Sequence, residues 1–143
     1  MKISEILKNN RATVSFEVFP PKQWDKIENT KAVVREMSKA APSFMSVTYG
    51  ASGTGAGFAR EIAQEVSADG ITPLSHLTCL TSTREKIHSV VGELKDCGVE
   101  NILALRGDIP EGFATGELPL SAYTGGSAIG MAGGYTMSKP LED

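Results

Sequence analysis

The sequence predicts an α/β protein with a parallel sheet, and it favours a (β/α) barrel over a doubly wound sheet. Short apolar segments alternate with segments in which apolar residues recur at helical spacing. No turn typical of a hairpin joins consecutive strands, so crossover connections and parallel pairing are expected. A polar residue near each strand end recurs at intervals of about 30 residues, the length of one βαβ unit, and this regularity favours the barrel.

The first strand is expected within VSFEVFPP, residues 14–21, where two prolines end it. Alternation gives this strand two faces, one formed by Val14, Phe16 and Val18 and the other by Ser15, Glu17 and Phe19. We expect the first face to pack outward against helices. The carboxylate of Glu17 is then expected to point into the barrel mouth, where ligands bind in this fold.

Three helices and three further strands follow in alternation. The helices are expected over residues 25–41, 58–70 and 82–98, and the strands over residues 43–50, 72–80 and 101–108. The expected start signals are two capping boxes, Asp25 with Glu28 and Ser82 with Glu85. The expected stop signals are Gly70 and Gly98. Each helix carries one apolar stripe, formed by Ile27, Val34, Met37 and Ala41, by Phe58, Ile62 and Val66, and by Ile87, Val90, Val91, Leu94 and Cys97.

Composition and charge argue against several classes of function. The 143 residues are 41% hydrophobic and 22% charged, with a formal net charge of -3 and a pI near 5.4. The Lys and Arg residues are spread out, so neither a nucleic-acid surface nor a membrane partner is expected. There is no apolar signal-peptide region and no run of about 18 apolar residues, which indicates a cytoplasmic protein. Cys79 and Cys97 lack metal-ligand spacing and are expected to be buried free thiols, with no metal site.

Four strands are expected to direct polar side chains to one place. The residues near the strand ends are Glu17, Thr48, His76 and Arg106, and Ala104 is expected to share the inward face with Arg106. Taken singly, each has an ordinary structural explanation, such as a core histidine or a carboxylate at the rim. Together they supply an acid, a polar orienting group and an anion clamp in one pocket, which favours a functional site.

Four segments resemble, in this order and spacing, the signature segments of the methylenetetrahydrofolate reductase family: SFEVFPPK, FMSVTYGA, HLTC and ALRGDIP. The resemblance covers residues 13–112. It implies a (β/α)8 TIM barrel that binds FAD at the carboxyl ends of its strands. It also implies an oxidoreductase that takes a hydride from NADH or NADPH and passes it to 5,10-methylenetetrahydrofolate. The 5-methyl product belongs to one-carbon metabolism and methionine biosynthesis.

The resemblance also implies roles for individual residues. Glu17 resembles the general acid that protonates the folate so that its five-membered ring opens. Thr48 resembles a contact on the nicotinamide side. The positions that match FAD contacts are Tyr49, Ala51, His76, Arg106, Gly107 and Asp108. Asp108 also resembles the carboxylate placed near the flavin and the pterin.

Two carboxylates in different surroundings suit these roles. Desolvation by Phe16, Phe19 and the flavin rings would raise the pKa of Glu17, as a general acid working near neutral pH requires. Asp108, in the turn after the fourth strand, is expected to stay ionised and to stabilise the cationic iminium of the folate. Arg106 and the backbone N–H groups that follow it suit the pyrophosphate or ribose oxygens of the flavin.

The rest of the sequence departs from the family pattern. A whole barrel takes about 250 residues, so residues 1–112 are expected to form only the first four βα units. Residues 113–143, rich in Gly, Ala and Ser, are expected to form an irregular tail. Two functions stay open. One is a flavin-dependent reductase or part of one, and the other is a non-catalytic half-barrel. In both, the unpaired edges of the first and fourth strands favour self-association or pairing with a second-half chain.

Overall fold

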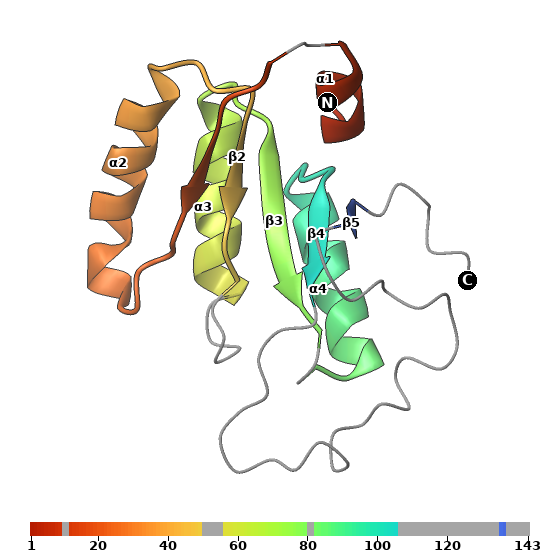
Figure 1. Cartoon of the computed structure of the whole chain (residues 1–143). Coiled ribbons are helices and arrows are strands. Elements are labelled where there is room, and N and C mark those ends of the chain that lie inside the picture. The colour runs from red at the N-terminus through yellow and green to blue at the C-terminus, as the bar shows by residue number, and fades with distance from the viewer. Residues whose placement is uncertain (10–11, 50–55, 80–81, 106–134, 137–143) are drawn as a thin grey trace.

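The strands of this protein form one sheet in which four neighbours are parallel. The computed structural model describes residues 1–9, 12–49, 56–79, 82–105 and 135–136. The parallel strands pair in chain order, and they are β1 (Ser15–Val18), β2 (Phe44–Val47), β3 (Pro73–Thr78) and β4 (Ile102–Leu105). A short strand, β5 (Tyr135–Thr136), pairs antiparallel with β4 (Figure 1).

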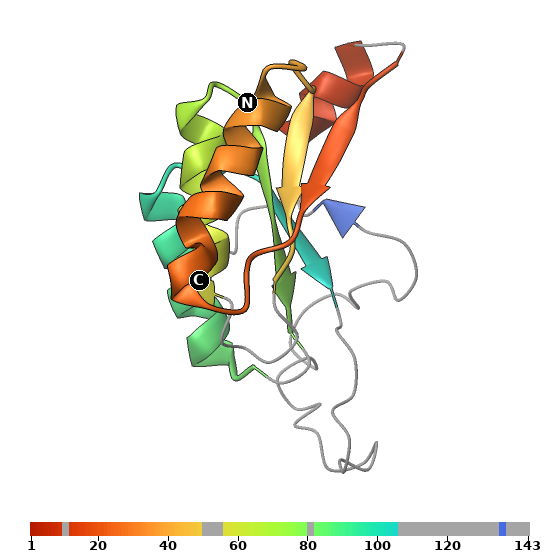
Figure 2. The same ribbon diagram turned by 90° about the vertical axis from the view of Figure 1, so that its left-hand side faces the viewer.

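Three helices connect the parallel strands and cover one face of the sheet. They are α2 (Ile27–Ser38), α3 (Ala56–Ala68) and α4 (Arg84–Asp96), with a 3-10 turn, η1 (Trp24–Lys26), before the first. Figure 2 shows these helices together on one side of the sheet and α1 (Ile3–Asn9) on the other. A doubly wound sheet has helices on both faces and a reversal of strand order. Here the connecting helices cover one face and the parallel strands pair in chain order, which is the order that barrels use. The predicted alternation of parallel strands and helices is confirmed.

The main core fills the space between the sheet and these three helices. The side chains with no exposed surface include Val34 from α2, Met45 and Val47 from β2, and Ile62 and Val66 from α3. Burial of each such side chain stabilises the fold by about 1.5–3 kcal/mol. The helical stripes predicted from the sequence therefore face the sheet. Cys79 also lies buried in this core, as expected. Cys97 is only partly buried and follows the end of α4, so its expected burial is wrong.

The faces of β1 agree with the prediction except at one residue. Val18 is buried and Phe16 packs against the main core, so this face meets the helices. Val14 was expected to do the same but is 61% exposed. It precedes the first residue of β1, at the amino end of the strand.

Two helix starts differ from the predicted capping boxes. Lys26 is the N-cap of α2 and makes no side-chain cap hydrogen bond, so the predicted start at Asp25 is wrong. At α4 the N-cap is Thr83 rather than Ser82, and its hydroxyl oxygen accepts a hydrogen bond from the Lys86 N–H at 3.3 Å. Serine and threonine are both good N-caps, so the sequence pattern alone did not distinguish these neighbours.

The predicted glycine stops are confirmed. Gly70 and Gly98 have φ angles of 79° and 78°, in the left-handed region that glycine adopts without strain. Ala41 was included in the apolar stripe of the first predicted helix. It lies beyond the end of α2, is exposed and has a φ of 48°, so that part of the stripe is wrong.

Helix α1, which the sequence pattern did not indicate, covers the amino end of the open face. Its residues Ile3 and Ile6 are buried against Leu74 of β3, with Phe44 and Leu103 packed around them. This second, smaller core lies on the side of the sheet opposite the main core. Helix α1 does not extend over the carboxyl ends of the strands (Figure 1).

The side chain of Asn101 anchors α1 to the sheet. Its Oδ1 accepts a hydrogen bond from the N–H of Ile3 at 2.9 Å. Its Nδ2 donates to the carbonyl oxygens of Met1 at 3.0 Å and of Pro73 at 3.3 Å. One buried amide therefore ties the chain start to the first residue of β3 and to the segment before β4.

The segment expected to be irregular contains β5. Leu103 pairs with Thr136 and Ala104 pairs with Tyr135. The prediction that the fourth strand has an unpaired edge is therefore wrong for these residues. The other residues between 106 and 143 lie outside the described part of the chain. Within the described part, no helix has the length and apolarity needed to cross a membrane.

Replacing Asn101 with alanine should destabilise the fold, because the buried N–H of Ile3 and the carbonyl of Pro73 lose a partner. We expect a decrease of about 1–3 kcal/mol in the free energy of unfolding, measured by urea titration. Glu100→Gln is the control, because it removes only an exposed ion pair with the chain terminus. Equal losses in the two variants would contradict the anchoring role of Asn101.

Candidate functional site

Polar side chains lie together on the open face of the sheet, near the carboxyl ends of its strands. Val47 pairs with Ser75, so the residues that follow them, Thr48 and His76, come side by side on the open face. Glu17 also lies on the open face, on β1, and the charge of its carboxylate acts to raise the pKa of His76. The structure therefore brings together three of the residues predicted from the sequence.

His76 is half-buried, and this burial lowers the pKa of its imidazole below the ordinary value of 6.5. The Glu17 carboxylate acts in the opposite direction but has the smaller effect. His76 is therefore neutral at pH 7, with one ring nitrogen as a donor and the other as an acceptor. A neutral imidazole suits hydrogen bonding to a polar ring edge better than it suits binding of an anion.

Glu17 is exposed in the described structure. Phe16, which was expected to flank it, points to the opposite face and packs against the helices. Phe19 follows the strand and is 71% exposed. The described residues therefore do not supply the apolar surroundings that the sequence analysis expected around this carboxylate.

Thr48 joins the ends of β1 and β2. Its backbone N–H donates to the carbonyl oxygen of Val18 at 3.0 Å, and its hydroxyl donates to the same oxygen at 3.4 Å. Because the hydroxyl proton is used in this contact, the hydroxyl oxygen is left as an acceptor toward the open face.

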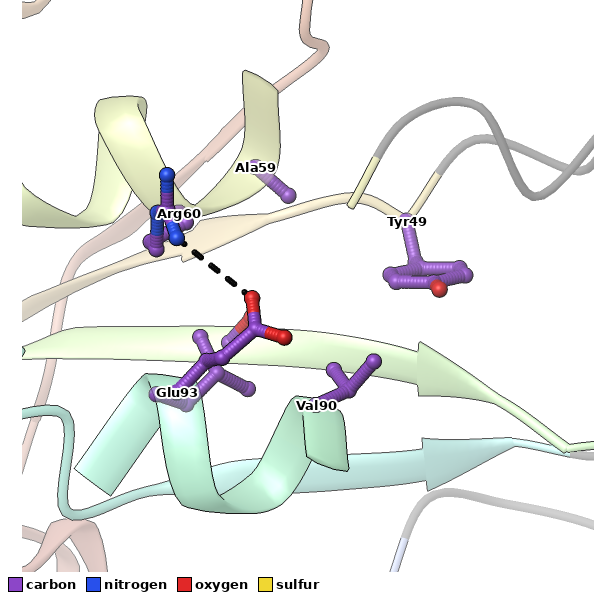
Figure 3. A pocket seen from close by; sticks show the side chains of 7 residues that line it. Tyr49, Ala59, Arg60, Val90 and Glu93 are labelled. Carbon is purple, nitrogen blue, oxygen red and sulfur yellow. Dashed lines mark hydrogen bonds and ion pairs between the residues drawn. The ribbon is translucent and has the colours of Figure 1, made fainter. Parts of the chain in front are cut away.

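Tyr49 follows Thr48 and therefore points to the other side of the sheet. Its ring is buried among residues of α3 and α4, where it lines a cavity of about 10 Å³ together with Ser75, Val90 and Glu93 (Figure 3). Glu93 forms an ion pair with Arg60 at 3.4 Å beside this cavity. The Tyr49 side chain is thus separated by the sheet from Glu17 and His76. A contact from Tyr49 to a ligand on the open face would have to use its backbone.

Two hydroxyl groups in this cavity have no hydrogen-bond partner among the described residues. They are the phenol of Tyr49 and the side chain of Ser75. Burial raises the pKa of Tyr49 above its ordinary value, and the charge of Glu93 acts in the same direction. The phenol is therefore un-ionised near neutral pH and does not contribute a charge to the site.

The fourth strand presents a different face from the one predicted. Leu77 pairs with Ala104, and both pack against the helix-side core, so the expected inward position of Ala104 is wrong. His76 pairs with Leu103 and Thr78 pairs with Leu105, so these two leucines lie on the open face. The sequence ILAL is apolar throughout, and its pattern alone contained no signal that would have identified them.

Four predicted site residues lie outside the described part of the chain: Ala51, Arg106, Gly107 and Asp108. Their roles stay predictions. The described residues contain no cluster of three or more His, Cys, Asp or Glu side chains that could hold a metal ion.

An α/β protein with polar groups at the carboxyl ends of parallel strands has the arrangement of an enzyme that binds small molecules there. The comparison with protein families identifies the family to which the chain belongs. The family model described as "Methylenetetrahydrofolate reductase" matches residues 2–120, and the chain belongs to the methylenetetrahydrofolate reductase family. The resemblance noted in the sequence is therefore confirmed.

Individual relatives give the same result over part of their length. "Methylenetetrahydrofolate reductase (NADH) 1" of Zea mays is 38% identical over 112 residues, which are 78% of this chain and 19% of the maize protein. "5,10-methylenetetrahydrofolate reductase" of Pectobacterium carotovorum is 34% identical over 102 residues, 71% of this chain and 34% of that protein. The Escherichia coli protein of the same name is 31% identical over 106 residues, 73% of this chain and 36% of its own length. The chain thus spans about a fifth of the maize relative and about a third of these bacterial ones.

The stability of the protein should depend on the ionisation of His76. Because burial lowers the pKa of His76, the unfolded state binds a proton more readily than the folded state. The stability of the fold with a neutral, half-buried imidazole is therefore fully present above pH 6.5, and it is lost as the pH falls through the lowered pKa of His76. Urea titrations between pH 7.5 and 5 should show a steeper loss for the wild type than for His76→Gln. His88→Gln, on α4, keeps His76 and should follow the wild type, and parallel curves for all three proteins would refute the assignment.

Tyr49→Phe should not destabilise the protein, because the phenol is buried without a partner among the described residues. We expect the free energy of unfolding to be unchanged or to increase by up to about 1 kcal/mol. Tyr49→Ala, which removes the buried ring and enlarges the cavity, should cost about 3–5 kcal/mol. A clear loss of stability in Tyr49→Phe would show that the phenol has a partner that contributes to folding.

Proposed function

We propose that this chain forms the first four βα units of a (β/α)8 barrel. In this barrel, 5,10-methylenetetrahydrofolate is reduced to the 5-methyl product with FAD and with NADH or NADPH. The observation that carries the proposal is the placement of Glu17, Thr48 and His76 on one open face, at the carboxyl ends of a parallel sheet of this family. The names of the relatives support the folate substrate, and those of the plant relatives specify NADH.

The described residues fit a planar ring with a polar edge. His76 offers one donor and one acceptor because its lowered pKa keeps it neutral. Leu103 and Leu105 provide an apolar surface beside it on the same face. Such a combination, apolar contact with a few placed polar groups, is typical of cofactor sites. FAD bound there would supply the hydride transfer, and the protein would supply position and charge.

In this proposal the environment of Glu17 changes when the open face is covered. The carboxylate is exposed in the described structure, so water solvates its charge. A ring lying over the open face would exclude that water and favour the protonated form. Glu17 could then donate a proton to the folate and open its five-membered ring, which is the role of a general acid.

Thr48 and the residues outside the described part complete the proposed site. The hydroxyl oxygen of Thr48 is left as an acceptor and suits an amide N–H of nicotinamide. We assign Asp108 to stabilising positive charge on the folate, and Arg106 and Gly107 to flavin phosphate or ribose oxygens. Ala51 is assigned to a flavin contact on the resemblance alone.

The proposal predicts that Glu17→Gln separates the two half-reactions of the flavin-loaded protein. Reduction of FAD by NADH should stay nearly intact, because no proton from Glu17 is needed there. The folate half-reaction should slow by about 10² to 10⁴, the usual scale for loss of a general acid. Stopped-flow absorbance of the flavin measures both steps. Glu5→Gln, an exposed carboxylate on α1, is the control, and equal slowing of both half-reactions by Glu17→Gln would refute the assignment.

A second candidate function is a non-catalytic half-barrel that pairs with another chain or copy. The observation in its favour is that β1 has a strand partner on one side only among the described residues. The absorbance of the purified chain distinguishes the two functions, because bound flavin is yellow. A colourless protein that takes up no added FAD would support the second function and contradict the first.

A further inference from the structure

The small cavity on the helix side of the sheet is lined by polar groups that the proposed function does not use. Its volume is about 10 Å³, and its lining includes Tyr49, Ser75 and Glu93 beside apolar groups of α3 and α4 (Figure 3). The sheet separates this cavity from the open face, on which Thr48 and His76 lie. The cavity is therefore distinct from the candidate functional site.

Two of these polar groups are deeply buried hydroxyls. Ser75 is 1% exposed and Tyr49 is 8% exposed, and neither hydroxyl has a hydrogen-bond partner among the described residues. Ser75 pairs with the fully buried Val47, so its side chain also lies on the helix side of the sheet. Burying a hydroxyl without a partner is costly, and nearly all such groups in proteins bond to another protein group or to an ordered water molecule.

Glu93 provides the third polar group in the lining. One of its carboxylate oxygens pairs with the Arg60 guanidinium at 3.4 Å, and the other accepts a hydrogen bond from the Ser89 hydroxyl at 3.2 Å. A carboxylate has about four acceptor positions, so it can accept a further bond. The Tyr49 phenol is un-ionised and can donate, as can the Ser75 hydroxyl. The cavity is thus lined by two donors and one acceptor.

The size and charge of the cavity restrict what it can hold. A volume of about 10 Å³ accommodates about one water molecule and excludes any larger ligand. The guanidinium of Arg60 disfavours a bound cation, and the carboxylate of Glu93 disfavours a bound anion. A buried water molecule needs two to four polar partners, and the three polar groups of the lining meet this requirement.

We propose that this cavity binds one water molecule, which accepts hydrogen bonds from the hydroxyls of Tyr49 and Ser75 and donates one to the carboxylate of Glu93. The water then joins the end of β2 and the middle of β3 to α4. Because Thr48 directly precedes Tyr49, the same water holds the carboxyl end of β2 beneath the candidate site. This inference rests on the cavity and does not depend on the proposed reductase activity.

A crystal structure of the full chain, at a resolution that shows ordered water, tests the site directly. We expect electron density for one water molecule within about 3.2 Å of both Tyr49 Oη and Ser75 Oγ. Density that shows the two hydroxyls bonded to other protein groups, with no water between them, would overturn the proposal.

Oxygen-17 relaxation dispersion of water counts long-lived internal water molecules in solution and tests which groups hold this one. Tyr49→Phe alone leaves the water two partners, and immobilising a water offsets much of what its bonds contribute, so this variant should keep both the water and its stability. The double variant Tyr49→Phe/Ser75→Ala leaves only Glu93 and should show one long-lived water fewer than the wild type. Ser38→Ala is the control, because its hydroxyl donates to the Val34 carbonyl at 2.9 Å and does not line the cavity. Equal counts in the wild type and the double variant would refute the site.

Amide hydrogen exchange tests whether the water holds the end of β2. The N–H of Thr48 donates to the Val18 carbonyl at 3.0 Å, and the N–H of Met45, near the other end of the strand, donates to the Thr72 carbonyl at 3.0 Å. In the double variant we expect exchange at Thr48 to be at least threefold faster and exchange at Met45 to be unchanged, because only the carboxyl end of β2 loses a link. Equal acceleration at both amides would indicate general destabilisation and contradict the link, as would unchanged exchange at Thr48.

Discussion

Burial of one face of the parallel sheet is the constraint on which the rest of the structure depends. Val18, Val47 and Leu77 are buried against α2, α3 and α4. Because side chains alternate along a strand, this burial fixes their neighbours Glu17, Thr48 and His76 on the open face. The same alternation puts the Tyr49 ring in the helix layer. The candidate site is thus a geometric consequence of the core, and a one-residue slip in any of these strands would remove its residue from the open face.

The sequence predicted most elements because their apolar residues follow a clear period. In β1 polar and apolar residues alternate throughout, and near the carboxyl ends of β2 and β3 they alternate over residues 46–48 and 76–78, so the faces could be assigned there in advance. In β4 all four residues are apolar, and nothing in ILAL shows which of them face the helices, so Ala104 was placed on the wrong face. Helix α1 has seven residues and only Ile3 and Ile6 buried, about two turns, which is too short for a period to be recognised. Its position depends on contacts with Leu74 and Asn101, which are distant in sequence.

Two effects compete at His76, and the outcome bears on the proposed chemistry. Burial disfavours the imidazolium, whereas the carboxylate of Glu17 favours it, and burial has the larger effect. A ligand that covers the open face would desolvate His76 further and would disfavour its imidazolium. The neutral imidazole keeps one donor and one acceptor for such a ligand. The sequence could place these residues on one face, but the exposure of Glu17 depends on which other side chains surround it and could not be predicted from alternation.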